Sequence, residues 1–306
     1  VYDVNSVSEI EGTVIDVSWR NPHVKMSLQV GDGEESSVWN LEMGAVNTIQ
    51  RLGVNTGAIV TGDKIRAAGA PAHDGAQRMF VSNILLNDGR ELLMLPASPP
   101  RWAEQASKQT VISAQDKAKA ELAAKGLFRV WTRRLSVPPA IDVTLTDTAR
   151  EVREQWDPIN DNPTLRCERP GMIEAMVTPS PIALEQAGQD IIIRMEEWDQ
   201  ARRVLMANST TQSAAAPNPL GHSIGRWDAE ILHVSTSHIN WPYFDDKGTP
   251  QSEKVVIEET FTISSDEQHM TWKAVIQDAE SLVGSATIIE EYVWIAGEQI
   301  KPYDCA

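Results

Sequence analysis

Glutamate and histidine side chains in the C-terminal half are the groups of this chain that could perform acid–base chemistry. Glu196, Glu290, His222 and His238 lie in or beside segments that have the composition of β-strands. If the fold brought a carboxyl and an imidazole into one pocket, they could act as general acid and general base. These four are the predicted catalytic residues of one alternative function, a lyase, isomerase or hydrolase without an organic cofactor.

A second group that could do chemistry lies near the N-terminus. His23 follows Asn21-Pro22 at the start of a strand, and Glu42 lies on a nearby strand. The pair could form a metal site or an acid–base pair, or His23 could simply fasten a loop. No HxH or HExxH spacing occurs in the chain. No cofactor is predicted, and copper or zinc handling through histidines is a second alternative function.

Tryptophan is unusually frequent, with ten residues against four tyrosines and four phenylalanines. Large flat rings that also donate a hydrogen bond suit a ligand site. The predicted ligand-binding residues lie in the C-terminal half: Arg194, Trp198, Arg226, Trp227, Trp241, Tyr243, Trp272, Tyr292 and Trp294.

The faces of two predicted strands decide between a ligand cavity and an outer surface. By the two-residue period of a strand, Glu290, Tyr292 and Trp294 share one face, and Arg194, Glu196 and Trp198 share another. If both faces point inward, the barrel holds charges among aromatic walls, and Arg194 needs Glu196 or Glu290 as a partner. If they point outward, these side chains pack on neighbouring segments.

The segment 239–246 combines three aromatic rings, a proline and two carboxylates between strands. Loops at the mouth of a barrel often carry function, so it could be a lid or recognition loop. An aromatic plug that closes the end of the barrel is the other interpretation.

Short strands and turns dominate the rest of the pattern and predict a mostly β fold with two small antiparallel barrels. Residues 1–97 indicate an OB-like barrel, and 166–306, with eight or so strands, a lipocalin-like barrel. Between them, 98–165 is predicted to be a partly helical connector with helices over 102–125 and 147–156. A polar surface loop is expected over 210–219.

Charge and apolar runs limit the partners. The net charge of −16 makes nucleic acid or an anionic membrane an unsuitable main partner. No run reaches the ~18 apolar residues that a transmembrane segment needs. The chain starts at Val1 without an initiator methionine, and we interpret this as removal of a signal peptide or trimming. Cys167 and Cys305 would be unpaired in a reducing cytosol and a disulfide in an exported chain.

Several longer phrases resemble an exported bacterial family of unknown function. In the first half they are Gly12-Thr-Val, Ser18-Trp-Arg-Asn-Pro-His23, Gly69-Ala-Pro-Ala and Asp88-Gly-Arg90. In the second half they are Gly221-His-Ser-Ile-Gly-Arg-Trp227, Gly248-Thr-Pro and Pro302-Tyr-Asp-Cys305. The resemblance implies export, to the periplasm or beyond the cell, and with it the Cys167–Cys305 disulfide. Gln251 stands where the family pattern has a histidine, which weakens a metal or acid–base role for that loop.

Together these features predict an exported binding or assembly protein. Its C-terminal barrel would hold a small apolar or aromatic ligand or dock a protein partner, and a homo-oligomer is possible. The enzyme and the metal-handling protein remain the alternatives.

Overall fold

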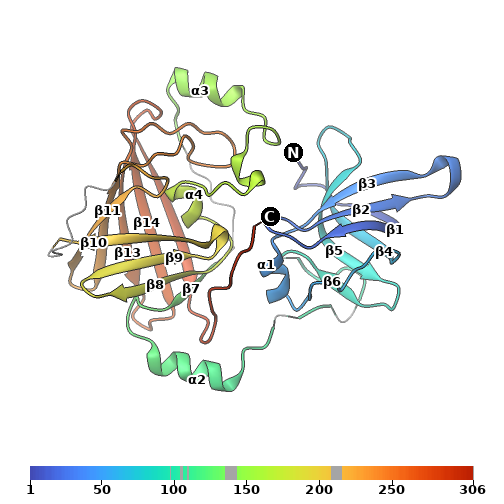
Figure 1. Ribbon diagram of the computed structural model, residues 1–306, viewed down its shortest axis with the longest axis horizontal. Helices are drawn as coiled ribbons and strands as arrows, with labels where there is room; N and C mark the ends of the chain where they lie inside the picture. Colours follow the sequence, from blue (N-terminus) through green and yellow to red (C-terminus); the bar gives the residue numbers. More distant parts are fainter. Residues whose placement is uncertain (97, 104–105, 109, 135–142, 208–215, 306) are drawn as a thin grey trace. The chain divides into compact units, whose positions relative to one another are not determined.

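The computed structural model describes residues 1–96, 98–103, 106–108, 110–134, 143–207 and 216–305 (Figure 1). The protein is mostly β, as predicted, and it contains two closed barrels. By its internal contacts the chain divides into one unit of Val1–Val111 with Asp304–Ala306 and a second unit of Ile112–Tyr303. Part of the surface loop predicted over 210–219 lies outside the described residues.

The first unit is a small barrel of five strands with a sixth strand beside it. The strands follow the order β3-β2-β1-β4-β5-β6, and a parallel pairing of β3 with β5 closes the barrel. Its elements are β1 (Ser8–Ser18), β2 (Lys25–Val30), η1 (Gly33–Glu35), β3 (Ser37–Glu42), α1 (Val46–Arg51), β4 (Lys64–Pro71), β5 (Arg78–Leu86) and β6 (Glu91–Leu93).

Alternating apolar residues explain this barrel. On β2, Met26 and Leu28 point into the core while Lys25 and Gln29 are exposed. Gly12 on β1 permits the close approach of β2, since a Cβ there would lie 2.2 Å from the carbonyl oxygen of Gln29.

The second unit is a closed barrel of nine strands in the order β10-β11-β12-β13-β14-β15-β7-β8-β9. Neighbours pair antiparallel except β10 and β11, which are parallel. Its strands are β7 (Val130–Arg133), β8 (Ile182–Ala187), β9 (Asp190–Met195), β10 (Gln200–Met206), β11 (His222–Asp228), β12 (Ile231–Ser237), β13 (Val256–Ile263), β14 (His269–Gln277) and β15 (Ser285–Val293). Its helices are α2 (Ala114–Ala123), α3 (Asp147–Glu154), η2 (Pro163–Arg166), α4 (Met172–Met176) and η3 (Glu197–Asp199).

The stretch 98–165 differs from the predicted helical connector. Its residues fall into both units, and it supplies β7, a strand that the sequence did not predict. Of the long helix predicted over 102–125, only α2 forms. It begins after Ser113, whose hydroxyl oxygen accepts a hydrogen bond from the backbone N–H of Asp116. Residues 101–103 instead donate their backbone N–H groups to the buried carboxylate of Glu91 at 2.7–2.9 Å. The second predicted helix is present as α3, capped by Thr146.

Both cysteines are oxidised to a disulfide, and since the chain has only two, Cys167 is bonded to Cys305 as the resemblance implied. Among the described residues, none of the helices has the length and apolar character that crossing a bilayer requires.

Candidate functional site

Large side chains and two ion pairs occupy the interior of the nine-stranded barrel. Arg202 on β10 makes a bidentate pair with Glu259 on β13 at 2.7 and 2.5 Å, and both side chains are almost fully buried. The same carboxylate accepts hydrogen bonds from the indole of Trp272 and the hydroxyl of Thr236. Sequence reasoning missed Arg202 and Glu259, although their positions on the inward face of each strand could have indicated them.

The second interior ion pair contains Glu290, one of the predicted catalytic residues. Glu290 accepts two hydrogen bonds from Arg133 on β7 at 2.6 and 2.8 Å. Tyr292 is fully buried and donates to the carbonyl oxygen of Met176 at 2.7 Å. As expected, Glu290 and Tyr292 share one face of β15, and in the structure that face points inward. Both polar groups are already engaged within the protein.

The predicted face of Arg194, Glu196 and Trp198 does not form. β9 ends at Met195, and Trp198 has a left-handed backbone with φ 56°, so the two-residue period stops before Glu196. Arg194 lies on the outer surface and pairs with Glu185 rather than with an interior carboxylate. Glu196 is buried and accepts the backbone N–H of Lys301, and the ring of Trp198 contacts that of Tyr303.

Of the remaining predicted ligand residues, Arg226 and Trp227 lie on β11, and Trp294, which follows β15, is partly buried against the barrel core. Arg226 is exposed on the outer face of β11. Trp227 is 42% exposed and meets the ring of Phe128 edge to face. Trp294 lies beneath the guanidinium of Arg129, whose central carbon is 4.5 Å from the ring centroid.

The short helix α4 packs against one end of the barrel core. Met172, Ile173, Ala175 and Met176 are buried in the same apolar cluster as the barrel interior. At the C-terminal end of the helix, the carbonyl oxygens of Met176 and Val177 accept hydrogen bonds from Tyr292 and Arg133. The side chains of Tyr292 and Arg133 therefore hold α4 in place by donating hydrogen bonds to carbonyl groups that have no partner within the helix.

The aromatic loop predicted to be functional lies against this helix. A Cβ on Gly171, the residue that precedes α4, would lie 2.5–2.7 Å from ring atoms of Trp241, so the indole contacts the backbone there directly. Tyr243 in the same loop meets Trp156 edge to face at 4.6 Å. Gln200, at the start of β10, donates its amide to the carbonyl of Pro170 at 2.9 Å.

We call Trp156, Glu174, Gln200, Trp241 and Tyr243 the α4 cluster. Three of its polar atoms, the indole nitrogens of Trp156 and Trp241 and Oε1 of Gln200, are buried and have no hydrogen-bond partner among the described residues. Buried polar groups without a protein partner are rare and commonly bind water or a ligand. The sequence predicted the two loop residues, Trp241 and Tyr243. It did not predict Trp156, Glu174 and Gln200, which lie in distant segments of the chain.

Glu174 is the titratable group of the cluster. Burial of its carboxyl, together with the negative charges of Asp246, Asp245 and Glu197, raises the pKa of Glu174 to about 8. At neutral pH this side chain is therefore mostly protonated and can donate a hydrogen bond. Asp245 is ordered as an acceptor from Lys247 and Thr249 within its own loop.

The two predicted catalytic histidines lie together, but away from the partners expected for them. The rings of His222 and His238 are 5.7 Å apart between centroids. Glu290 is held by Arg133, and Glu196 is bonded to the backbone of Lys301. The predicted pairing of imidazole with carboxyl in one pocket therefore has no counterpart in these contacts.

His23 and Glu42 do come together in the five-stranded barrel. Nδ1 of His23 is 2.6 Å from Oε1 of Glu42, and the hydroxyl of Tyr2 donates to the other carboxylate oxygen at 2.7 Å. Burial raises the pKa of Glu42, but hydrogen bonds from His23 and Tyr2 and the charge of His23 outweigh it, so this pKa lies below its ordinary value. The carboxylate orients the imidazole. Within the described parts of the chain, no three His, Cys, Asp or Glu residues form a metal-binding group.

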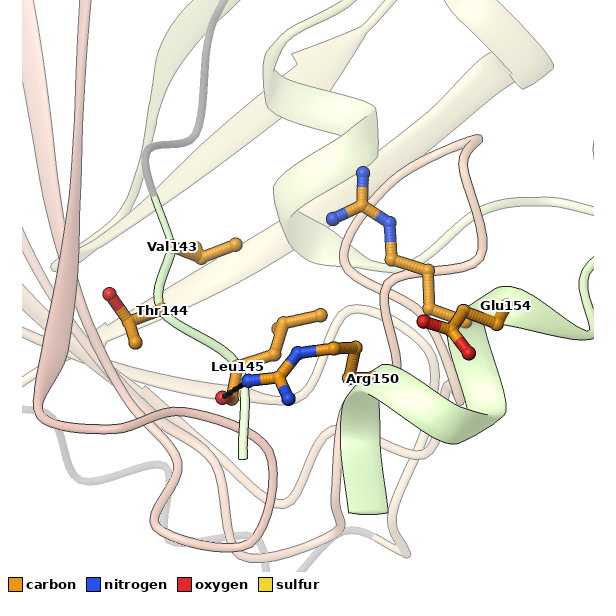
Figure 2. Close-up of a pocket in the computed structure, with 6 residues that line it drawn as sticks. Val143, Thr144, Leu145, Arg150 and Glu154 are labelled. Atoms are coloured by element: carbon orange, nitrogen blue, oxygen red, sulfur yellow. Dashed lines mark hydrogen bonds between the residues drawn. The ribbon is translucent and has the colours of Figure 1, made fainter. Parts of the chain in front are cut away.

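An open groove of about 490 Å³ lies outside these clusters, between α3 and residues 143–145 (Figure 2). Figure 2 shows Arg150 reaching from α3 to the carbonyl of Leu145, a contact of 3.4 Å, while Glu154 follows on the same helix. A groove of about 540 Å³ in the first unit is lined by glycine backbone and by Lys64 and Arg66, and Arg66 is paired with Glu11. Neither groove contains a predicted site residue.

Comparison with known proteins bears on the first unit. Neither the curated proteins nor the solved structures include a match to the chain. The sequence phrases resemble a family of unknown function. Tyr2, His23, Glu42 and Phe80, which lie in contact in the first unit, all fall within the residues that a family model matches. Residues 1–80 match the sequence model of a family described as "Family of unknown function (DUF6152)".

Proposed function

We propose that the protein is an exported binding protein that holds a small uncharged molecule at the α4 cluster, at one end of the nine-stranded barrel. The observation that carries this proposal is the buried indole N–H of Trp241, which has no partner among the described residues and lies against the start of α4. The disulfide between Cys167 and Cys305 supports export, because such bonds persist in oxidising compartments.

The polar groups of the cluster define the chemistry of the ligand. The indoles of Trp156 and Trp241 and the protonated carboxyl of Glu174 are donors, so the ligand supplies acceptors such as carbonyl or ether oxygens. Oε1 of Gln200 accepts, which suits a hydroxyl or N–H on the ligand. The rings of Trp241 and Tyr243 offer apolar surface for an aromatic or alicyclic frame.

Charge in the surroundings argues against an anionic ligand. The carboxylates of Asp245, Asp246 and Glu197 are close enough to raise the pKa of Glu174. The same charges would repel an anion. The interior of the barrel is less suited to the ligand, because Trp272 and Tyr292 already donate to Glu259 and Met176.

The test is a binding screen by ligand-observed NMR with uncharged aromatic carbonyl compounds, such as coumarin and chromone, and their carboxylated analogues. Trp241→Phe removes the indole N–H and keeps a ring, and Trp227→Phe is the matched control at an exposed site. Losing one hydrogen bond to the ligand should weaken binding by about three- to tenfold.

Supporting results are binding of the uncharged compounds to the wild type, weaker binding to Trp241→Phe, and unchanged binding to Trp227→Phe. The proposal is wrong if no uncharged compound binds, if both variants bind as the wild type does, or if only charged compounds bind.

A further inference from the structure

Two histidines at one end of the β11–β12 hairpin lie against each other. His222 is the first residue of β11, where it pairs with Ser237 of β12, and His238 directly follows Ser237. The ring centroids are 5.7 Å apart and the rings are inclined by 54°. The hairpin register thus brings the two imidazoles side by side.

Each ring has a nitrogen that could bind a metal ion. Nε2 of His222 is buried without a hydrogen-bond partner in the described part of the chain. Nδ1 of His238 lies 2.9 Å from the hydroxyl of Ser237. If Nδ1–H donates to this hydroxyl, Nε2 of His238 carries the lone pair, and an outer partner on the other nitrogen is the usual arrangement of a metal-bound histidine.

The backbone of His238 is a second, independent observation. Its φ of 57° lies in the left-handed region, which only a few per cent of non-glycine residues adopt, asparagine, aspartate and histidine more often than the others. Such conformations persist where the surrounding structure enforces them and are concentrated at functional sites. Here the conformation falls on the residue directly after β12, whose ring centroid lies 5.7 Å from that of His222.

We propose that His222 and His238 bind one divalent copper or zinc ion through their Nε2 atoms, with the remaining positions open to water or a small ligand. Two imidazoles that share a metal through bonds of about 2.0–2.1 Å place their ring centres roughly 5–6 Å apart, which includes the observed distance. Imidazole nitrogen suits copper and zinc, whereas calcium and magnesium prefer oxygen ligands. Among the described residues no third His, Cys, Asp or Glu completes the site.

The experiment is titration of the full-length, chelator-treated protein with Cu²⁺ and Zn²⁺ by calorimetry, with electron paramagnetic resonance of the copper form. His222→Gln replaces the imidazole by an amide of similar size, and in His238→Asn the new asparagine tolerates the left-handed backbone. His233→Gln and His269→Gln are the matched controls, since both histidines lie on strands of the same barrel, β12 and β14. Circular dichroism verifies that each variant is folded.

The wild type should bind one equivalent, with two nitrogen ligands in the copper spectrum. Each site variant should lose at least about tenfold in affinity, and the two controls should bind as the wild type does. The proposal is overturned if the folded wild type binds neither ion. It is also overturned if the double variant His222→Gln/His238→Asn keeps the affinity, or if the spectrum shows fewer than two nitrogens. Because these probes are metal ions, the outcome is separate from that of the screen with uncharged ligands.

Discussion

Replacing Glu174 by glutamine should change how the stability of the nine-stranded barrel depends on pH. Burial and the charges of Asp246, Asp245 and Glu197 raise the pKa of this carboxyl to about 8 in the folded protein, from an ordinary value of 4.5. Between these two values the folded state holds a proton that the unfolded state releases. The wild type therefore loses stability as the pH rises from about 4.5 to about 8, and it is penalised in full above that range.

The size of this loss follows from the two pKa values. A difference between 4.5 and about 8, at about 1.36 kcal/mol for each pH unit, corresponds to at most about 4–5 kcal/mol. Glutamine keeps the shape and the hydrogen-bonding capacity and has no charge to form. Near pH 5, the free energy of unfolding of the variant should equal that of the wild type to within about 1 kcal/mol. Near pH 9, it should exceed that of the wild type by about 2–5 kcal/mol.

The assay is urea unfolding at the two pH values, followed by hydrogen exchange of the amides of β14 and β15, which reports on the nine-stranded barrel alone. Other groups titrate alike in both proteins and cancel in the difference. Glu121→Gln, the same change at an exposed position on α2, corrects for the amide itself. A difference between variant and wild type that is the same at both pH values, or larger at low pH, would refute the reasoning.

Three further substitutions test the structure. Cys167→Ser should lower the melting temperature in oxidising buffer, because the disulfide closes the long loop between Cys167 and Cys305 and should contribute roughly 4–5 kcal/mol. A melting temperature equal to that of the wild type would contradict the disulfide. Arg202→Met leaves Glu259 buried without its partner and should cost about 3–5 kcal/mol in urea unfolding, whereas Arg194→Met, at an exposed pair, should cost less than about 1 kcal/mol; equal costs would mean that the interior pair is not formed. Thr146→Ala removes the cap of α3 and should cost about 1 kcal/mol by the same assay, with Thr144→Ala, at an exposed position outside the helix, as the control.

Strands with a clear two-residue period and a turn between them could be predicted from the sequence. The hairpin of β13 and β14 is an example, because buried and exposed residues alternate along both strands. β8 could not be predicted, because its residues, Ile-Ala-Leu-Glu-Gln-Ala, favour helix and its first three are all buried. Pairing with β7 and β9 overrides that local preference.

The candidate site was only partly predictable because its members come from separate segments. Aromatic residues in a proline-containing loop drew attention to Trp241 and Tyr243. Glu174 lies in a helix of five residues, too short for a periodic signal, and its raised pKa depends on carboxylates distant in sequence. The period of β15 predicted that Glu290 and Tyr292 share a face but left its direction open, and the partner of Glu290, Arg133, lies on a strand that no pattern indicated.

The most direct test of the proposed function is the indole N–H signal of Trp241 in a proton–nitrogen correlation spectrum of the labelled protein, assigned with Trp241→Phe. Addition of coumarin should shift this signal with saturation, because the unpartnered N–H gains an acceptor, and should leave the signal of Trp272, which already donates to Glu259, in place. A Trp241 signal that stays fixed while other tryptophan signals move would contradict the proposed site.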